Sequence, residues 1–232
     1  MQISAPIYHL KRRAKQMSKA QEMPLHQALD LIAGEEGYMG WSHLAASHNG
    51  QSPAQRILAA LNPGQMLLLG ARPGQGKTLL ALELALEASK RGEIPRFYTL
   101  DYTQADVDAR LTDLGAGHPA PFAIETSDEI CASYIEATAT EHAATLVVID
   151  YMQLLDQKRI NPPLEAQLAA LRAFATHSGV RIVLISQIDR RFDLDDRVMP
   201  GLKDVRLPNP ADLHLFDKTC FLHERAVDLV VL

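Results

Sequence analysis

The sequence predicts an α/β fold in which helices flank a mostly parallel sheet. From about residue 65 onward, short apolar runs rich in β-branched residues alternate with longer segments of helical periodicity, which is typical of βαβ units. The first 60 residues differ, because they show helical periodicity without such runs. We therefore predict a basic leader and small helical appendage over residues 1–60, and an α/β domain over residues 61–232.

The length and composition narrow the class further. A chain of 232 residues and 25.6 kDa suffices for one large domain with an appendage. Its 47% apolar and 22% charged residues argue against disordered, collagen-like and coiled-coil classes. No run approaches the roughly 20 apolar residues that span a bilayer, and the first 20 residues lack a secretory leader pattern. We expect a cytoplasmic protein that does not associate with membranes.

The expected elements follow from periodicity and turn residues. Strands are predicted at 66–70, 96–100, 122–125, 146–150, 181–186, 219–223 and 227–231. The clearest helix, 77–91, places Leu80 and Leu84 at helical spacing, and Gly92 ends it. Further helices are predicted at 104–114, 128–142 and 164–177.

Charge is unevenly distributed along the chain. Residues 1–20 contain no acid and five bases: Lys11, Arg12, Arg13, Lys15 and Lys19. Because the net charge of the whole chain is -5, the remainder is strongly acidic. A basic leader can attract phosphate backbones, and a solvated, frayed helix is the alternative.

The segment 25–48 predicts two short helices around three glycines. Tyr38 and Trp41 lie in this segment at a spacing that suits aromatic side chains closing a helical hairpin. A recognition surface is the alternative role for the pair.

A candidate phosphate-binding loop follows the first strand. Its residues are Ala71, Arg72, Pro73, Gly74, Gln75, Gly76, Lys77 and Thr78. They lie between an apolar strand and an amphipathic helix, as a P-loop requires. Gly74 and Gly76 allow the backbone N–H groups to approach phosphates. Lys77 supplies positive charge to the β and γ oxygens, and the Thr78 hydroxyl can ligate Mg²⁺. Ala71 replaces the usual glycine, so only the permissive form of the motif is met.

A second motif supports nucleotide binding. The apolar strand ending at residue 150 finishes in an acid, Asp150, which places a carboxylate at the edge of the sheet where open α/β folds bind ligands. Asp150 is expected to hold Mg²⁺ through a water molecule. Together the two motifs predict a site for a nucleotide and Mg²⁺.

Three segments, in their order and spacing, resemble the nucleotide-binding segments of the RecA-like ATPase domain of DnaB-type replicative DNA helicases. They run from Ala71 to Thr78, from Ile149 to Leu155 and from Ile185 to Arg190. The run from Asp150 to Leu154 is the most family-specific. The stretches 195–207 and 211–213 resemble the next segment of that domain. The resemblance begins near residue 60 and implies a RecA-like P-loop NTPase core that binds ATP.

The resemblance also implies roles for two further polar residues. Gln187, at the end of its strand, would sense the γ-phosphate by hydrogen bonding. Asp101 matches the acid that polarises the attacking water, where Glu is usual in the family. A carboxylate can orient water, but Asp is one methylene shorter, so hydrolysis could be slow. Lys77, Asp101, Asp150 and Gln187 are therefore the candidate catalytic residues, and Thr78 and Asp150 the candidate metal ligands.

The chain departs from the family in three respects. The family has a larger N-terminal helical domain. It also has a Lys-x-Arg element that reaches the neighbouring subunit's γ-phosphate; the sequence ends where this element would follow, and Arg225 is the nearest late arginine. In the DNA-loop region 187–208, the five bases Arg190, Arg191, Arg197, Lys203 and Arg206 are balanced by the five acids Asp189, Asp193, Asp195, Asp196 and Asp204. Lys158 and Arg159 form the other basic pair at a plausible loop, and a solvated surface charge is the alternative for these two residues and for Arg191.

Two functional hypotheses follow. In the first, the chain is an ATPase that acts on single-stranded DNA as a homo-oligomer, because the family completes each ATP site with a neighbouring subunit. In the second, it is a nucleotide-dependent switch or binding module without helicase activity. The intact sensor and metal residues favour the first hypothesis, and the three departures favour the second.

Overall fold

In a computed structural model, the chain divides into two compact units, Met1–Ser52 and Pro53–Leu232. The structure describes residues 5, 7–21, 23–41, 44, 52–99, 101–116, 120–156, 158–194, 197–207, 209–224 and 226–231. Helix α4 (Pro53–Ala60), which the sequence analysis assigns to the appendage, packs in the core of the second unit through Ile57 and Leu58. The structural division therefore falls before α4.

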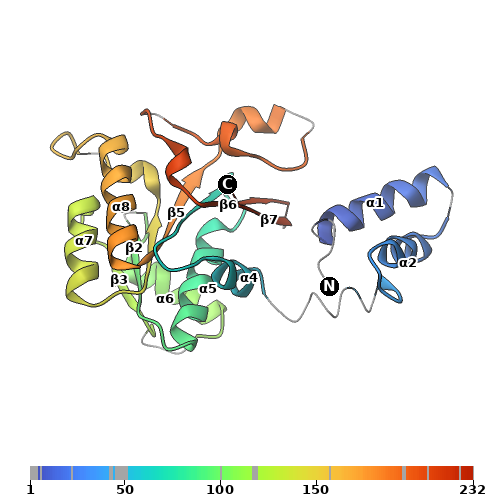
Figure 1. Cartoon of the computed structure of the whole chain (residues 1–232), viewed down its shortest axis with the longest axis horizontal. Helices are drawn as coiled ribbons and strands as arrows, with labels where there is room; N and C mark the ends of the chain where they lie inside the picture. Colours follow the sequence, from blue (N-terminus) through green and yellow to red (C-terminus); the bar gives the residue numbers. More distant parts are fainter. Residues whose placement is uncertain are drawn as a thin grey trace. The chain divides into compact units, whose positions relative to one another are not determined.

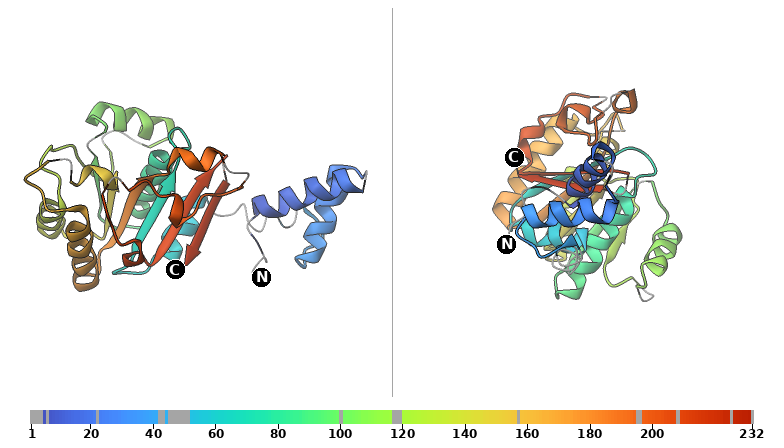
Figure 2. Two further views of the ribbon diagram at one scale, coloured as in Figure 1. Left: turned by 90° about the horizontal axis from the view of Figure 1, so that it is seen from above. Right: turned by 90° about the vertical axis from the view of Figure 1, so that its right-hand side faces the viewer.

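The second unit is built on a seven-stranded sheet with the order β3-β2-β4-β5-β1-β6-β7 (Figure 1). The strands are β1 (Met66–Ala71), β2 (Pro95–Thr99), β3 (Ala123–Glu125), β4 (Leu146–Asp150), β5 (Arg181–Gln187), β6 (Lys218–His223) and β7 (Ala226–Val231). Neighbouring strands are parallel except β6 and β7, which lie side by side as an antiparallel pair at one edge (Figure 2). The predicted α/β class with a mostly parallel sheet is confirmed.

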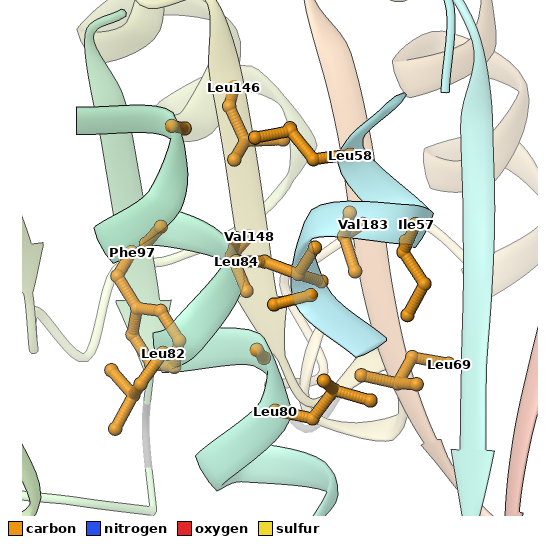
Figure 3. Packing of buried hydrophobic residues seen from close by; sticks show 14 of the residues in the cluster. Ile57, Leu58, Leu69, Leu80, Leu82, Leu84, Phe97, Leu146, Val148 and Val183 are labelled. Atoms are coloured by element: carbon orange, nitrogen blue, oxygen red, sulfur yellow. The ribbon is translucent and has the colours of Figure 1, made fainter. Parts of the chain in front are cut away.

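Helices cover both faces of this sheet, because its strand residues alternate between two apolar cores. Leu67 and Leu69 of β1 belong to the core under α4, α5 (Lys77–Lys90) and α6 (Gln104–Asp113). Figure 3 shows Leu80 and Leu84 of α5 projecting into this core. Leu68 of β1 belongs to the opposite core, under α7 (Ala132–Glu141) and α8 (Leu164–Ser178).

The predicted helix 128–142 begins too early. In the structure α7 begins at Ala132, because the preceding residues form a turn in which the Ser127 hydroxyl accepts a hydrogen bond from the Glu129 N–H. Short side chains of this kind compete with helical hydrogen bonds at helix starts. The predicted strands at 66–70, 146–150 and 181–186 each match an observed strand to within one residue.

The segment after β5 is irregular and contains two short 3₁₀ helices, η2 (Arg190–Leu194) and η3 (Leu202–Asp204). It returns to the end of β5 through an isolated antiparallel bridge between Ile188 and Val205. The Arg206 N–H also donates to the Gln187 carbonyl at 2.8 Å. These contacts hold both ends of the 188–206 segment beside the last residue of β5.

The described part of the first unit includes two helices, α1 (Ile7–Ala20) and α2 (Leu25–Glu35), with a small apolar core. The fully buried side chains of this core include Leu10 of α1 and Ile32 of α2. Tyr38 is 9% exposed, and Trp41 packs partly buried against the same cluster. The predicted packing role of these two aromatic side chains is confirmed.

Candidate nucleotide-binding site

The phosphate-binding loop, residues 71–78, connects β1 to α5, and Lys77 is the first residue of that helix. Gly74 and Gly76 have φ values of 77° and 85°, a left-handed conformation that other residues rarely adopt. A Cβ placed on either glycine would have no heavy atom within 4 Å. Among the described residues no side chain caps the start of α5, so its backbone N–H groups remain available to an anion.

Thr78 and Asp150 form a buried pair beneath this loop. The Thr78 Oγ1 donates a hydrogen bond to the Asp150 Oδ2 at 2.8 Å, and the two residues are 8% and 2% exposed. Burial raises the pKa of the Asp150 carboxyl to about 6, although the Thr78 hydrogen bond and the Lys77 charge oppose this shift. A divalent cation would stabilise such a disfavoured carboxylate, and both residues offer the oxygen ligands that Mg²⁺ prefers. The pair therefore fits a Mg²⁺ site.

The register of the sheet places the candidate residues at one edge. Asp150, the last residue of β4, lies opposite Thr99, the last residue of β2. Ala71 at the end of β1 lies opposite Gln187 at the end of β5. Because β2, β4, β5 and β1 are neighbours in the sheet, their carboxyl ends gather these residues along one line. This is the edge at which open parallel sheets bind ligands.

Asp101 follows β2 by two residues and is exposed. Its N–H donates to the Thr99 Oγ1 at 3.2 Å. Asp101 also lies near enough to Asp150 for its charge to raise the pKa of that carboxyl further. The structure thus brings Asp101 to the same edge and leaves its carboxylate open to solvent.

Gln187 contacts the irregular segment that follows it. Its side-chain Oε1 accepts a hydrogen bond from the Arg206 Nη1 at 3.3 Å. The N–H of the next residue, Ile188, donates to the Ala71 carbonyl at 3.1 Å. Gln187 therefore lies between the phosphate-binding loop and Arg206.

Gln153 is a structural residue that sequence reasoning did not single out. Its Nε2 donates to the Ser186 Oγ at 2.8 Å and to the Arg206 carbonyl at 2.7 Å. It therefore fixes the end of the 188–206 segment against β5. The signal was present in the sequence, since Gln153 belongs to the family-like run that follows Asp150.

Arginine side chains line a cavity beside the phosphate-binding loop. The cavity has a volume of about 510 Å³, and its lining includes Arg72, Asp189, Arg190, Arg191 and Arg206. With four bases against one acid, these lining residues carry a net positive charge. The surface therefore suits an anionic ligand.

The balanced charge of residues 187–208 is misleading, because the fold pairs some of the acids. The Arg72 Nη2 lies 2.8 Å from the Asp193 Oδ2. The Arg197 Nη1 lies 2.7 Å from the Asp204 Oδ2. Asp204 is thus paired with an arginine outside the described lining of the cavity, whereas Asp193 pairs with Arg72, which lines the cavity.

The other charged residues that the sequence analysis named lie on the surface or outside the described residues. Lys158 pairs with Asp128 at 2.9 Å, which agrees with the surface alternative for this basic pair. Arg159 is exposed. Arg225, Asp195 and Asp196 lie outside the described residues.

The fold and the glycine loop define a P-loop NTPase core. The AAA domain family matches residues 61–192. The chain belongs to this family, since the match covers more than half of its length.

Sequence relatives agree with the helicase resemblance. The replicative DNA helicase DnaB of Leifsonia xyli subsp. xyli is 24% identical over 192 residues, which cover 68% of this chain and 42% of that protein. The replicative DNA helicase DnaB of Mycoplasma genitalium is 24% identical over 204 residues, which cover 69% of this chain and 44% of that protein. The chain thus spans less than half the length of these curated relatives.

Solved structures support the fold. The ATPase domain of G40P has a TM-score of 0.58 at 17% identity, covering 78% of this chain and 81% of that one. A DnaB-like replicative helicase, whose structure addresses its interactions with primase, has a TM-score of 0.59 at 15% identity, covering 97% and 74%. The predicted resemblance to a DnaB-type RecA-like ATPase domain is confirmed. In the described part of the chain, no helix has the length and apolarity needed to cross a membrane.

Proposed function

We propose that the chain is a Mg²⁺-dependent ATPase of the DnaB-like type that acts on single-stranded DNA as an oligomer. The observation that carries the proposal is the Thr78–Asp150 hydrogen bond, which lies buried beneath an open glycine loop at the carboxyl edge of the sheet. These residue types in this arrangement bind nucleotide phosphates and their metal ion. The AAA domain match and the DnaB relatives support the same assignment.

Each residue of the site has a separate role in phosphoryl transfer. The glycine-loop N–H groups and Lys77 hold the β- and γ-phosphates and stabilise the charge that develops on them. Thr78 and Asp150 would hold Mg²⁺, which when bound would neutralise negative charge on the phosphates. Asp101 orients the attacking water from its open position at the same edge.

Gln187 reports the nucleotide state. Its Oε1 accepts a hydrogen bond from Arg206, and its Nε2 amide can donate to a γ-phosphate oxygen. The presence or loss of the γ-phosphate is thereby transmitted to the 188–206 segment. The arginine-lined cavity in this segment supports contact with a single-stranded DNA backbone.

One observation favours the nucleotide switch as a second candidate function. Asp101 is a shorter acid than the Glu that is usual in the family, so its carboxylate reaches less far from the backbone. General-base and water-positioning effects depend steeply on such distances. A protein that binds ATP and hydrolyses it very slowly would act as a switch and not as a motor.

Steady-state ATP hydrolysis with and without single-stranded DNA tests the proposal, on protein whose mass is measured by light scattering. Asp101→Glu and Asp101→Asn are compared with Asp108→Asn, which alters a half-buried acid of α6. We expect turnover that DNA stimulates, a faster rate for Asp101→Glu and a large loss for Asp101→Asn. Asp108→Asn should behave as wild type.

The outcomes separate the two candidate functions. DNA-stimulated turnover by an oligomer supports the ATPase. Tight ATP binding by a monomer, with negligible turnover that DNA leaves unchanged, rejects the motor and leaves the switch. If the protein does not bind ATP, both functions fail.

A further inference from the structure

Helix α1 carries all the lysine and arginine side chains of residues 1–52 and no acid. One of them, Arg13, is neutralised by Glu35 at 2.7 Å. The other four are exposed and, within the described part of the chain, make no hydrogen bond or ion pair. We call these four residues, Lys11, Arg12, Lys15 and Lys19, the α1 basic stripe.

The helical repeat aligns the stripe. Lys11, Lys15 and Lys19 follow one another at intervals of four residues, so they lie on one face with a separation of about 6 Å along the axis. Arg12 adds a fourth cation beside them. The stripe therefore presents a row of positive charges at regular spacing.

Packing against α2 fixes the direction in which the stripe points. Leu10 and Ala14 of α1 are fully buried, and Met17 packs partly buried against the same core. At 100° per residue these three positions lie on the face opposite Lys15 and Lys19. The fold of the first unit thus holds the stripe toward solvent. A frayed leader would have no such fixed direction.

The same packing argues against a membrane as the ligand. A helix that binds a bilayer surface inserts its apolar face into the lipid. The apolar face of α1 is already occupied by α2, through residues such as Ile32. The exposed face of α1 carries the basic side chains.

The remaining surface chemistry fits a phosphate backbone. The separation between successive lysines is close to the rise of two nucleotides on one strand, about 6.8 Å. Lysines are flexible point charges that contact phosphates without requiring one geometry. Because the rest of the chain is acidic, long-range attraction to nucleic acid must come from such a local cluster.

We propose that the α1 basic stripe is a nucleic-acid-binding site that contacts the phosphate backbone without sequence preference. This site is distinct from the arginine-lined cavity of the ATPase unit. It requires neither ATP nor hydrolysis, so it stands independently of the proposed enzymatic function.

Fluorescence anisotropy of labelled DNA tests the proposal on the full chain without nucleotide, between 50 and 200 mM salt. Lys15→Gln/Lys19→Gln is compared with Lys90→Gln/Arg91→Gln, which removes the same charge at the end of α5. Lys15→Arg/Lys19→Arg keeps the charge. Single-stranded and duplex DNA form separate arms, and vesicles with anionic lipid form a third.

We expect the stripe variant to bind DNA on the order of tenfold more weakly at low salt. The log–log salt slope should fall by about 1.4 on single-stranded DNA, or about 1.8 on duplex, from 0.7 and 0.9 per contact. The α5 variant and the arginine variant should retain the wild-type slope. Unchanged Trp41 fluorescence checks that the first unit remains folded.

An unchanged salt slope in the stripe variant would overturn the proposal, as would an equal loss in the α5 variant. Vesicle binding that depends on the stripe, with no effect on DNA, would overturn it in favour of a lipid surface. ATP hydrolysis measured on the same preparations shows separately whether the proposed enzymatic function holds.

Discussion

The carboxyl edge of the sheet and the α1 basic stripe are two charged regions built in opposite ways. At the sheet edge, Asp150 is 2% exposed, and its place is set by strand register and by a hydrogen bond from Thr78. In the stripe, Lys15 and Lys19 are exposed and have no partner within the described residues. Ligand binding at the sheet edge depends on the position of each atom, whereas binding at the stripe depends on the summed charge.

This difference determines how each region responds to substitution. Replacing a buried group leaves its hydrogen-bond partner unsatisfied, because water does not reach that partner. The whole interaction free energy is then lost. Replacing one exposed charge of a row removes only the contribution of that charge to the binding free energy, and salt screens this contribution. The sheet edge should therefore show large, site-specific effects, whereas the stripe should show graded effects.

The largest expected effect is at the phosphate-binding loop. Lys77→Ala removes the cation at the start of α5, and we expect ATP affinity to fall by about 1,000-fold, or about 4 kcal/mol. Lys90→Ala, at the other end of the same helix, is the matched control and should bind ATP normally. Titration with a fluorescent ATP analogue measures both, and unchanged binding by Lys77→Ala would reject the site assignment.

The next effect tests whether the two units differ in stability as well as in charge. Ile32 is 0% exposed in the small core of the first unit, whereas Leu31 beside it is 51% exposed. Ile32→Ala should destabilise this unit by about 3 kcal/mol, and Leu31→Ala should have little effect.

Trp41 makes the measurement selective, because it is the one tryptophan of the chain and packs against that core. In urea, the fluorescence transition of Ile32→Ala should move to lower concentration. The far-UV circular dichroism transition, which reports mainly the larger unit, should stay in place. Coincident shifts of both transitions would show instead that the two units unfold together.

A smaller effect is expected in the segment that carries the arginine-lined cavity. The side-chain hydrogen bonds from Arg197 lower the pKa of the Asp204 carboxyl below its ordinary value of 3.8. This stabilisation is fully present above the ordinary value and is lost as the pH falls through the lowered pKa. Asp204→Asn should cost about 1 kcal/mol at pH 7.

Urea unfolding at pH 7 and pH 3 checks this expectation. The wild type should lose more stability between these values than Asp204→Asn, because the variant has no carboxylate to protonate at this site. Asp108→Asn, which removes a half-buried carboxylate of α6, serves as the control. An equal pH dependence in wild type and Asp204→Asn would show that the ion pair does not stabilise the segment.

The sequence predicted the parts of the fold that local patterns encode. The apolar strand 146–150 and the helix beginning at Lys77 are visible in periodicity and in the glycines before the helix, and both occur in the structure. The start of α7 at Ala132 was not visible in the periodicity, because the preceding residues form a turn in which the Ser127 hydroxyl accepts a hydrogen bond from the Glu129 N–H.

The candidate site was predictable where function depends on residues at strand ends. Asp150 and Gln187 are both found there because the strand pattern fixes their edge of the sheet. The arginine-lined cavity was not predictable, because it depends on which acid each arginine meets. Arg72 and Asp193 are far apart in the chain, and their ion pair exists only once the irregular segment folds back.

That ion pair joins the phosphate-binding loop to the irregular segment beside the cavity. Arg72 belongs to the phosphate-binding loop, and its Nε and Nη1 donate to the Asp193 Oδ2 at 2.9 Å and the Ile188 carbonyl at 3.0 Å. Suppose that a ligand in the cavity displaces Asp193 and changes the affinity for nucleotide by some factor. Thermodynamic reciprocity then requires nucleotide to change the affinity for that ligand by the same factor. Any such coupling would pass through Arg72, because this side chain belongs to the phosphate-binding loop and also lines the cavity.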